Sequence, residues 1–145
     1  MPAVVQSTEV RLVGQMRYPM PNYPCEFEIP DSWLAEAGMI GFICSAPAYR
    51  STAGAELVRL AEIEPPPRVT TVQKDWRGFD RSRMISVLRG IVEGAQIEPV
   101  PLFKPERMSE FVPHPYNYLV RDGFHRFYGS IVARFEYLPC LIVLF

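Results

Sequence analysis

Apolar residues recur with helical spacing in two segments of the chain. In "DRSRMISVLRGIVEG" they predict a helix with one apolar face, formed by Met84, Val87, Leu88, Ile91 and Val92. Asp80 or Ser82 is expected at the N-cap of this helix, and Gly94 is expected to end it. The same spacing runs through residues 123–135 and predicts a second helix, with Asp122 at its N-cap position.

Short stretches of other apolar patterns predict strands around these helices. Residues 9–16 and 25–29 are expected to form a β-hairpin, because the prolines of "RYPMPNYP" between them favour a turn or an edge. In "IPDSWLAEAG" Asp31 or Ser32 would cap one or two helical turns, and "MIGFIC" then predicts a buried strand. Further strands are expected in "AELVRLAEI", "EPVPLF", "YNYLV" and "YLPCLIV".

Length and composition narrow the function classes. A chain of 145 residues suits one domain, and 15 Lys and Arg against 16 Asp and Glu exclude the basic bias of a general nucleic-acid binder. The cysteines Cys25, Cys44 and Cys140 are far apart and form no CxxC pair, so neither a disulfide framework nor a zinc site is expected. The N-terminus lacks the pattern of a signal peptide, and no apolar run reaches the ~20 residues of a membrane helix. We therefore expect a cytoplasmic protein with no membrane partner and no metal site of its own.

The segment "VRDGFHRF" is the main candidate for chemistry. A helix start carries unpaired backbone N–H groups and a partial positive charge, which together attract anions. Gly123 would let an anion approach the backbone, while His125 and Arg126 would add donors within one turn. The alternative is structural, because Asp-Gly before a helix is also a common turn with an N-cap. Local pattern alone favours this second interpretation.

A longer ordered pattern carries a resemblance to a known family. From about Leu57 to Val143 the chain presents in order a strand, "IEPPPR", a loop, a helix, "EGAQIEPVPLF", "YLVRDGFHRFYGS" and "ARFEYLPCLIV". This order resembles the ParB/sulfiredoxin-like domain. The resemblance implies an α+β fold in residues 56–145, with a small mixed sheet and two main helices. Residues 1–55 would form a β-rich N-terminal extension packed on that domain.

The resemblance also implies a nucleotide site. Members of this family bind nucleotide phosphates at the start of the corresponding helix, which here would use Asp122, Gly123, His125 and Arg126, with Arg68 from the upstream box. The expected ligand is a phosphorylated small molecule or a nucleotide such as CTP, ATP or ADP, with Mg²⁺ as a further cofactor. If the protein is an enzyme, His125 and Glu64 would be catalytic in phosphoryl transfer or in phosphodiester or nucleotide hydrolysis, as in a nucleotide-dependent phosphotransferase, a nuclease or an NTPase.

Departures from the family pattern exclude some activities and leave an alternative. Phe124 occupies the position of the sulfiredoxin cysteine, so sulfur repair is not expected. No helix-turn-helix follows the closing strand, so a DNA partner would have to bind by another route. The alternative function is a non-catalytic ParB-like interaction module for a protein or DNA. An exposed apolar patch around Tyr18, Met20 and Tyr23 would favour it, and a homodimer is compatible with either function.

Overall fold

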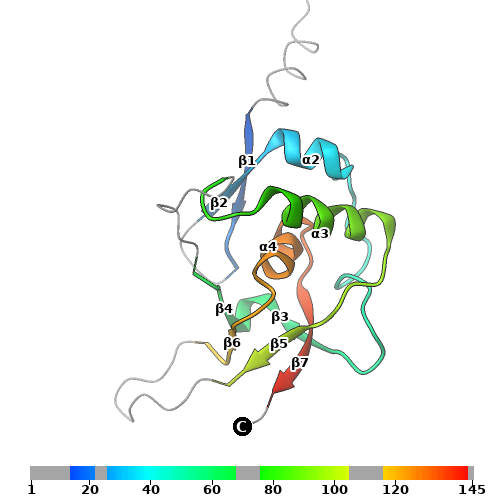
Figure 1. Ribbon diagram of the computed structural model, residues 1–145. Helices are drawn as coiled ribbons and strands as arrows, with labels where there is room; N and C mark the ends of the chain where they lie inside the picture. Colours follow the sequence, from blue (N-terminus) through cyan, green and yellow to red (C-terminus); the bar gives the residue numbers. More distant parts are fainter. Residues whose placement is uncertain (1–13, 22–25, 68–75, 105–115, 144–145) are drawn as a thin grey trace, which may run out of the picture.

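The described part of the chain contains three α-helices and two β-sheets (Figure 1). The computed structural model describes residues 14–21, 26–67, 76–104 and 116–143. In chain order, the elements are β1 (Gln15–Pro19), β2 (Glu26–Pro30), α2 (Asp31–Ala37), β3 (Glu56–Arg59), the 3-10 turn η1 (Leu60–Glu62), β4 (Ile63–Glu64), α3 (Arg81–Glu93), β5 (Val100–Phe103), β6 (Tyr118–Val120), α4 (Phe124–Val132) and β7 (Tyr137–Val143).

The larger sheet is mixed, as expected. Its five strands lie in the order β3-β7-β5-β6-β4. The pairs β3–β7 and β5–β6 are antiparallel, whereas β5–β7 and β4–β6 are parallel. Strands β1 and β2 form an N-terminal hairpin as a separate two-stranded sheet. Strand β1, however, extends through residues 17–19, which were expected to belong to the turn, and most of the predicted first strand lies outside the described residues. The α+β class is therefore confirmed.

Residues 55–63 do not form the single strand that their alternation predicts. The 3-10 turn divides this segment into β3 and β4, which lie at opposite edges of the sheet. The Leu60 N–H donates to Glu136 O over 3.0 Å, and Glu62 O accepts the Asn117 N–H over 3.0 Å. The turn is thus tied to the ends of β7 and β6, so the segment crosses from one edge to the other while keeping an alternating sequence.

Two local predictions in the N-terminal part are wrong. Residues 39–44 form no strand, because a turn centred on Gly41, with φ +83°, redirects the backbone and leaves Ile43 82% exposed. Neither Asp31 nor Ser32 is the N-cap of α2, since Pro30 precedes the first helical residue, Asp31. The Asp31 N–H donates instead to Gly14 O over 2.9 Å.

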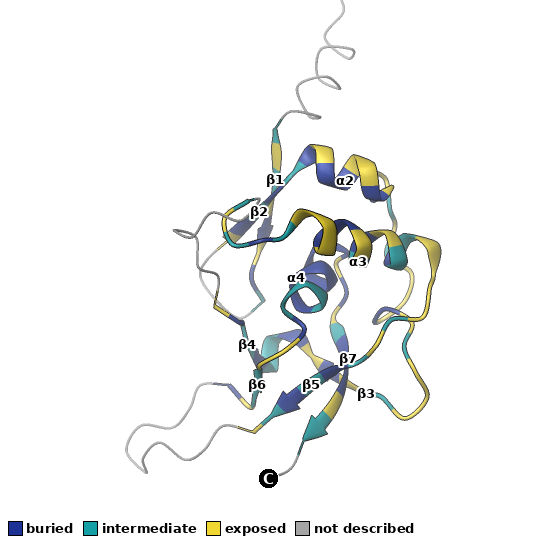
Figure 2. Cartoon of the chain, in the orientation of Figure 1, coloured by how far each residue is buried: buried dark blue, intermediate teal, exposed yellow. Residues whose placement is uncertain are grey.

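The helices stack in layers on one side of the large sheet (Figure 1). Helix α4 packs on β7, α3 packs on α4, and α2 packs on α3. Figure 2 shows α4 buried along most of its length, whereas α3 exposes its outward side. Side chains from the hairpin and α2, including Phe27 and Trp33, belong to the same apolar core as Phe127 and Leu138. The hairpin and α2 therefore share one core with α4 and β7.

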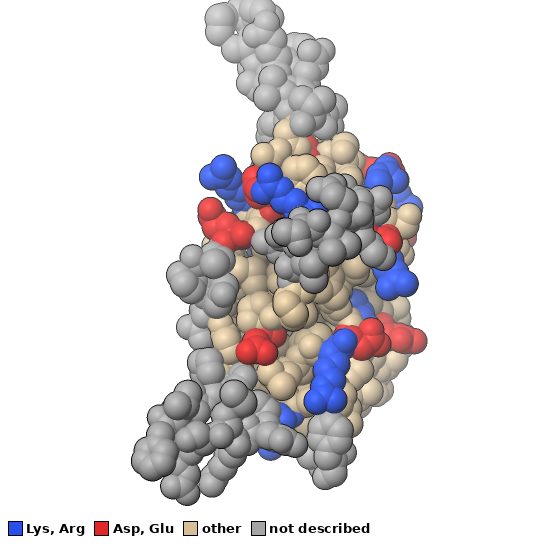
Figure 3. Space-filling model, turned by 60° about the vertical axis from the view of Figure 1, so that its left-hand side comes forward, with Lys and Arg blue, Asp and Glu red and all other residues tan. Residues whose placement is uncertain are grey.

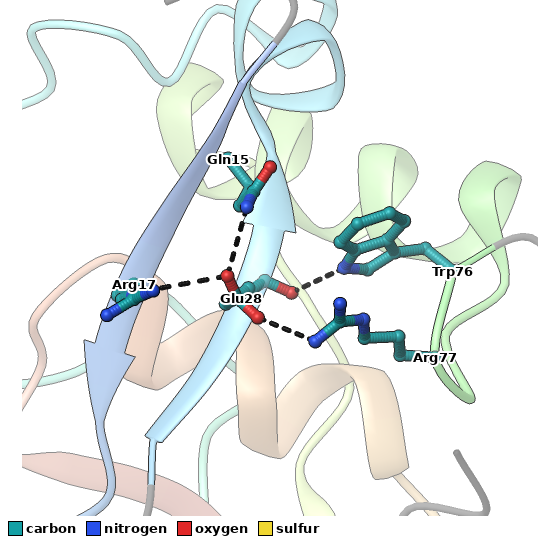
Figure 4. A network of polar contacts seen from close by, with 5 residues as sticks. All are labelled: Gln15, Arg17, Glu28, Trp76 and Arg77. Carbon is teal, nitrogen blue, oxygen red and sulfur yellow. Dashed lines mark hydrogen bonds and ion pairs between the residues drawn. The ribbon is translucent and has the colours of Figure 1, made fainter. Parts of the chain in front are cut away.

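The hairpin is joined to the turn that precedes α3 by contacts around Glu28 (Figure 4). The Glu28 carboxylate pairs with Arg77 Nη1 at 2.7 Å and Arg17 Nε at 3.7 Å, and it accepts a 3.2 Å hydrogen bond from Gln15. The Trp76 indole N–H donates to Glu28 O over 2.9 Å, and the Arg77 guanidinium lies 4.9 Å from the centre of the Trp76 ring. Trp76 therefore fixes the turn to the hairpin.

The contact between α3 and α4 depends on a residue without a side chain. A Cβ atom on Gly129 would lie 2.9 Å from Val87 Cγ1 and 3.7 Å from Leu88 Cδ2. Val87 is β-branched and its χ1 is restricted in a helix, so it has little room to move away. Glycine at this position allows the two helices to approach each other closely.

We predict that Gly129→Ala lowers the free energy of unfolding by about 1–2 kcal/mol, although alanine is the better helix former by about 1 kcal/mol. The measurement is urea unfolding followed by circular dichroism. Val87→Ala is the matched variant, because the smaller side chain should offset much of the loss when the two changes are combined. A stabilised Gly129→Ala protein would contradict the close contact.

Candidate functional site

The start of α4 is held by a glycine that no other residue replaces easily. Gly123 has φ +103°, in the left-handed region, and a Cβ there would lie 2.9 Å from Val100 Cγ1. Gly123 is itself the N-cap, and its carbonyl accepts the Phe127 N–H over 2.9 Å. The prediction that Asp122 caps this helix is therefore wrong. The Asp122 side chain is 86% exposed, and its Oδ2 lies 3.9 Å from Arg126 Nη2.

His125 joins α4 to the start of α3. Its Nε2 accepts a 3.0 Å hydrogen bond from the Asp80 N–H, and Asp80 Oδ1 accepts the Arg83 N–H, also over 3.0 Å. Asp80 is the N-cap of α3, as one of the two predicted alternatives had it. In a capping box the side chain three residues into the helix bonds back to the N-cap N–H. Here a histidine from a second helix supplies that bond, and it must carry no proton on Nε2 to do so.

Arg126 holds the loop between α3 and β5. Its Nη1 donates to Glu98 O at 3.1 Å and Pro99 O at 2.9 Å, and its side chain is 17% exposed. The Tyr49 hydroxyl donates to the same Glu98 carbonyl over 2.7 Å, and Ser51 Oγ donates to Ile97 O over 2.6 Å. The loop is thus fixed from two sides, by α4 and by the segment that leads into β3.

A cavity of about 560 Å³ lies between the start of α4, the α3–β5 loop and the first turns of α3. Its polar lining includes three arginines, two serines and two carboxylates, which are Arg83, Arg121, Arg126, Ser82, Ser86, Glu98 and Asp122. Val87, Ile97 and Phe124 provide an apolar wall. The volume falls within the range of roughly 300–1,000 Å³ that is typical of small-molecule sites.

The donors of this cavity differ in how far the protein already uses them. The Arg121 guanidinium lies 4.6 Å from the centre of the Phe103 ring, and Arg126 is engaged with the loop. The guanidinium of Arg83 and the hydroxyls of Ser82 and Ser86, by contrast, make no hydrogen bond or ion pair within the described ranges. These three side chains of α3 are therefore the donors that a ligand would meet.

The structure brings together four of the expected site residues and separates the others. Asp122, Gly123, His125 and Arg126 all line the cavity, but Glu64 lies on the edge strand β4 and does not. Arg68 falls outside the described residues. The sequence reasoning missed Ser82, Arg83 and Ser86. Their signal was the polar side of the predicted helix, which carries several arginines.

Charge on the rest of the surface is mixed. Figure 3 shows basic and acidic side chains interspersed on one face of the molecule. In the described part of the chain, no three His, Cys, Asp or Glu side chains are grouped as a metal site. Within the same ranges, no helix combines the length and apolar character that crossing a membrane requires.

Comparison of this chain with protein-family models, with curated proteins and with solved structures finds no match. The resemblance to the ParB/sulfiredoxin-like domain therefore stays a prediction, and the site has to be judged on its own geometry.

The hydrogen bond between His125 and Asp80 makes a prediction about stability. His125→Phe keeps an aromatic ring beside Phe79 and Phe124 but leaves the Asp80 N–H without its acceptor, so we expect a loss of about 1–3 kcal/mol in the free energy of unfolding. Chemical denaturation gives this number directly. His125→Ala should lose more, because it also removes the ring, and a His125→Phe protein as stable as the parent would contradict the capping role.

Tyr49 predicts a dependence of stability on alkaline pH. Burial raises the pKa of its hydroxyl above the ordinary value of 10.0, so the unfolded chain loses this proton at lower pH than the folded protein does. The contribution of the Tyr49 hydroxyl to the free energy of unfolding is therefore fully present below about pH 10, and it declines as pH rises further.

In Tyr49→Phe the decline above pH 10 should be shallower, by up to about 1.4 kcal/mol per pH unit, as measured by urea unfolding over a pH series. Tyr18 and Cys140, whose pKa values burial raises to about 12, remain in the variant and account for the residual slope. Equal slopes for the two proteins would show that Tyr49 ionises as easily in the fold as outside it.

Proposed function

We propose that the cavity between α3 and α4 binds a phosphate-bearing small molecule, with a nucleotide as the best candidate. The observation that carries this proposal is the set of three arginines around one cavity, of which Arg83 has no hydrogen bond or ion pair within the described ranges. Guanidinium groups are the side chains best suited to phosphate oxygens, because their paired N–H donors match two oxygens at once. The apolar wall offers a surface for the remainder of the ligand.

The proposal assigns different roles to the two helices. His125 and Arg126 position the walls, since each already uses a polar atom to hold α3 or the α3–β5 loop. Arg83, with Ser82 and Ser86, would contact the phosphate groups directly. Arg126 Nη2 lies 3.9 Å from the exposed Asp122 carboxylate, a contact that a phosphate could replace.

Mg²⁺ would enter this site with its nucleotide. Glu98 and Asp122 line the cavity, and carboxylate oxygens together with phosphate oxygens are the ligands that Mg²⁺ prefers. If the protein is an enzyme, it would catalyse phosphoryl transfer from the bound ligand or hydrolysis of that ligand. Release of phosphate during the binding experiments below distinguishes an enzyme from a binding protein.

The test is a thermal-shift screen with ATP, ADP, CTP and GTP, each with and without Mg²⁺, followed by calorimetric titration of the best ligand. We expect Arg83→Ala to weaken binding by about tenfold or more, because a hydrogen bond to a charged group contributes roughly 1.5–3 kcal/mol. The melting temperature of the free protein should stay unchanged, since the Arg83 side chain makes no polar contact with the described residues.

Arg59→Ala is the matched control. Arg59 is an exposed arginine on β3 that pairs at 3.7 Å with exposed Glu136 and lies outside the cavity, so this variant should bind as the parent does. Arg126→Ala is less informative, because it removes donors from Glu98 O and Pro99 O and should lower the melting temperature by itself. Absence of any shift with every nucleotide would refute the proposal.

The alternative function, an interaction module for a partner protein, would use other surface residues than the sequence suggested. Tyr18 and Met20 are 6% and 8% exposed, so they form no surface patch, and Tyr23 lies outside the described residues. Ile40 and Ile43, however, are 50% and 82% exposed on the loop after α2. If a partner protein binds there, Ile43→Asp should abolish the complex while Arg83→Ala leaves it intact.

A further inference from the structure

The C-terminal end of α4 places an arginine where glycine is the usual residue. Arg134 has φ +67°, and its N–H donates to Ile131 O over 3.0 Å, while the Phe135 N–H donates to Ser130 O, also over 3.0 Å. These two bonds define a Schellman motif, in which the left-handed position is most often glycine because a Cβ is strained there. Arg134 is therefore held in a conformation that its side chain disfavours.

The cap itself does not need this guanidinium. Gly129 O, Ser130 O and Ile131 O already accept backbone N–H groups from Ala133, Phe135 and Arg134. A cation beyond a helix C-terminus interacts favourably with the helix dipole, but a basic residue elsewhere in the last turn would supply the same charge without backbone strain. Within the described ranges, the Arg134 guanidinium makes no hydrogen bond or ion pair. Its location must be explained by something other than the helix end.

That location is the rim of a second cavity, of about 300 Å³, between β1 and the end of α4. Its wall is apolar and is formed by Met20, Leu60, Ile131 and Phe135, together with two prolines. Its polar residues are Arg17, Tyr18 and Arg134, so no acidic side chain lines it. This cavity is separate from the one between α3 and α4, with which it shares no residue.

Tyr18 supplies a second polar group to the lining of this cavity. The residue is 6% exposed, and its hydroxyl has no hydrogen-bond partner among the residues that the structure describes. Among the described residues, this hydroxyl is not one of the fully buried side-chain polar atoms that lack a hydrogen bond, so it is reached from the surface and can donate a hydrogen bond to a ligand. Burial raises the pKa of Tyr18 to about 12, so at neutral pH the group is a protonated donor. Neither the Tyr18 hydroxyl nor the Arg134 guanidinium has a hydrogen-bond acceptor among the described residues.

We propose that this cavity binds a small amphipathic carboxylate, with an apolar alkyl or aryl body against the wall and the carboxylate between Arg134 and the Tyr18 hydroxyl. Arg17 adds a second positive charge at the rim, although its Nε lies 3.7 Å from Glu28. The neighbouring cavity of about 140 Å³ also contacts Tyr18 and Arg134, but the buried carboxylate of Asp31 lines it and would repel an anion. The larger cavity is therefore the one that suits the charged end of the ligand.

The experiment compares three probes by NMR titration of the full chain: octanoate, octanol and acetate. Octanol keeps the apolar body without the charge, and acetate keeps the charge without the body. Octanoate should bind saturably, with the largest shifts at Tyr18, Ile131 and Arg134, and at least about tenfold more tightly than octanol. Acetate should show no saturable binding. Equal affinities for octanoate and octanol, or no saturable octanoate binding, would overturn the proposal.

Arg134→Gly is the decisive variant, because a merely structural role and a binding role predict opposite results for it. Removing the strained side chain should leave the melting temperature equal to or above that of the parent. Octanoate affinity should nevertheless fall by about tenfold or more, and Arg134→Lys should recover part of it. Tyr18→Phe should also weaken octanoate binding, whereas Arg83→Ala should leave it unchanged. Undiminished octanoate binding by Arg134→Gly would refute the assignment.

Discussion

The hydrogen bond from the Asp80 N–H to His125 Nε2 joins the two long helices at the point where both begin. Asp80 in turn caps α3 by accepting the Arg83 N–H, so α4 fixes the orientation of the first turn of α3. On the opposite side of the same cavity, Arg126 holds the α3–β5 loop through Glu98 and Pro99. The shape of the cavity therefore depends on bonds made within the protein by the two residues that looked most like ligand donors.

This arrangement explains why the local pattern was ambiguous. Histidine and arginine at a helix start are suited to anions, but the same donors and acceptors serve equally well as partners for backbone groups of neighbouring elements. Sequence spacing does not show which partner is present, because the partners of His125 and Arg126 lie 45 and 28 residues away in the chain. What the spacing does show is that the two side chains lie close together at one end of a buried helix.

Much of the fold could be predicted, because it follows from local periodicity. Helix α3 agrees with the apolar spacing and with Asp80 and Gly94 as its ends, and the mixed sheet also agrees, whereas the N-terminal hairpin forms with its first strand shifted toward the predicted turn. The failures have tertiary causes. The alternating pattern continues through residues 55–63 although hydrogen bonds to the ends of β6 and β7 bend the backbone there. Gly123, and not Asp122, is the N-cap of α4, at a position where only glycine fits against Val100. Arg83 was missed because a polar position on a helix has the same sequence pattern whether its side chain donates to a ligand or only faces water.

The two ends of α4 show how one backbone conformation has two different consequences. At the start, Gly123 adopts φ +103° beside Val100, and any side chain there would disrupt both the turn and the packing on β5. At the end, Arg134 adopts φ +67° toward a cavity, where a side chain is strained but not in collision. Steric necessity explains why residue 123 is a glycine, but it does not explain why residue 134 is an arginine. When a chain retains a disfavoured residue at a position that glycine would suit better, the chemistry of the side chain is the remaining explanation. At Arg134 that chemistry is a positive charge in the same cavity lining as the Tyr18 hydroxyl, and these two groups are the basis for proposing an anionic ligand there.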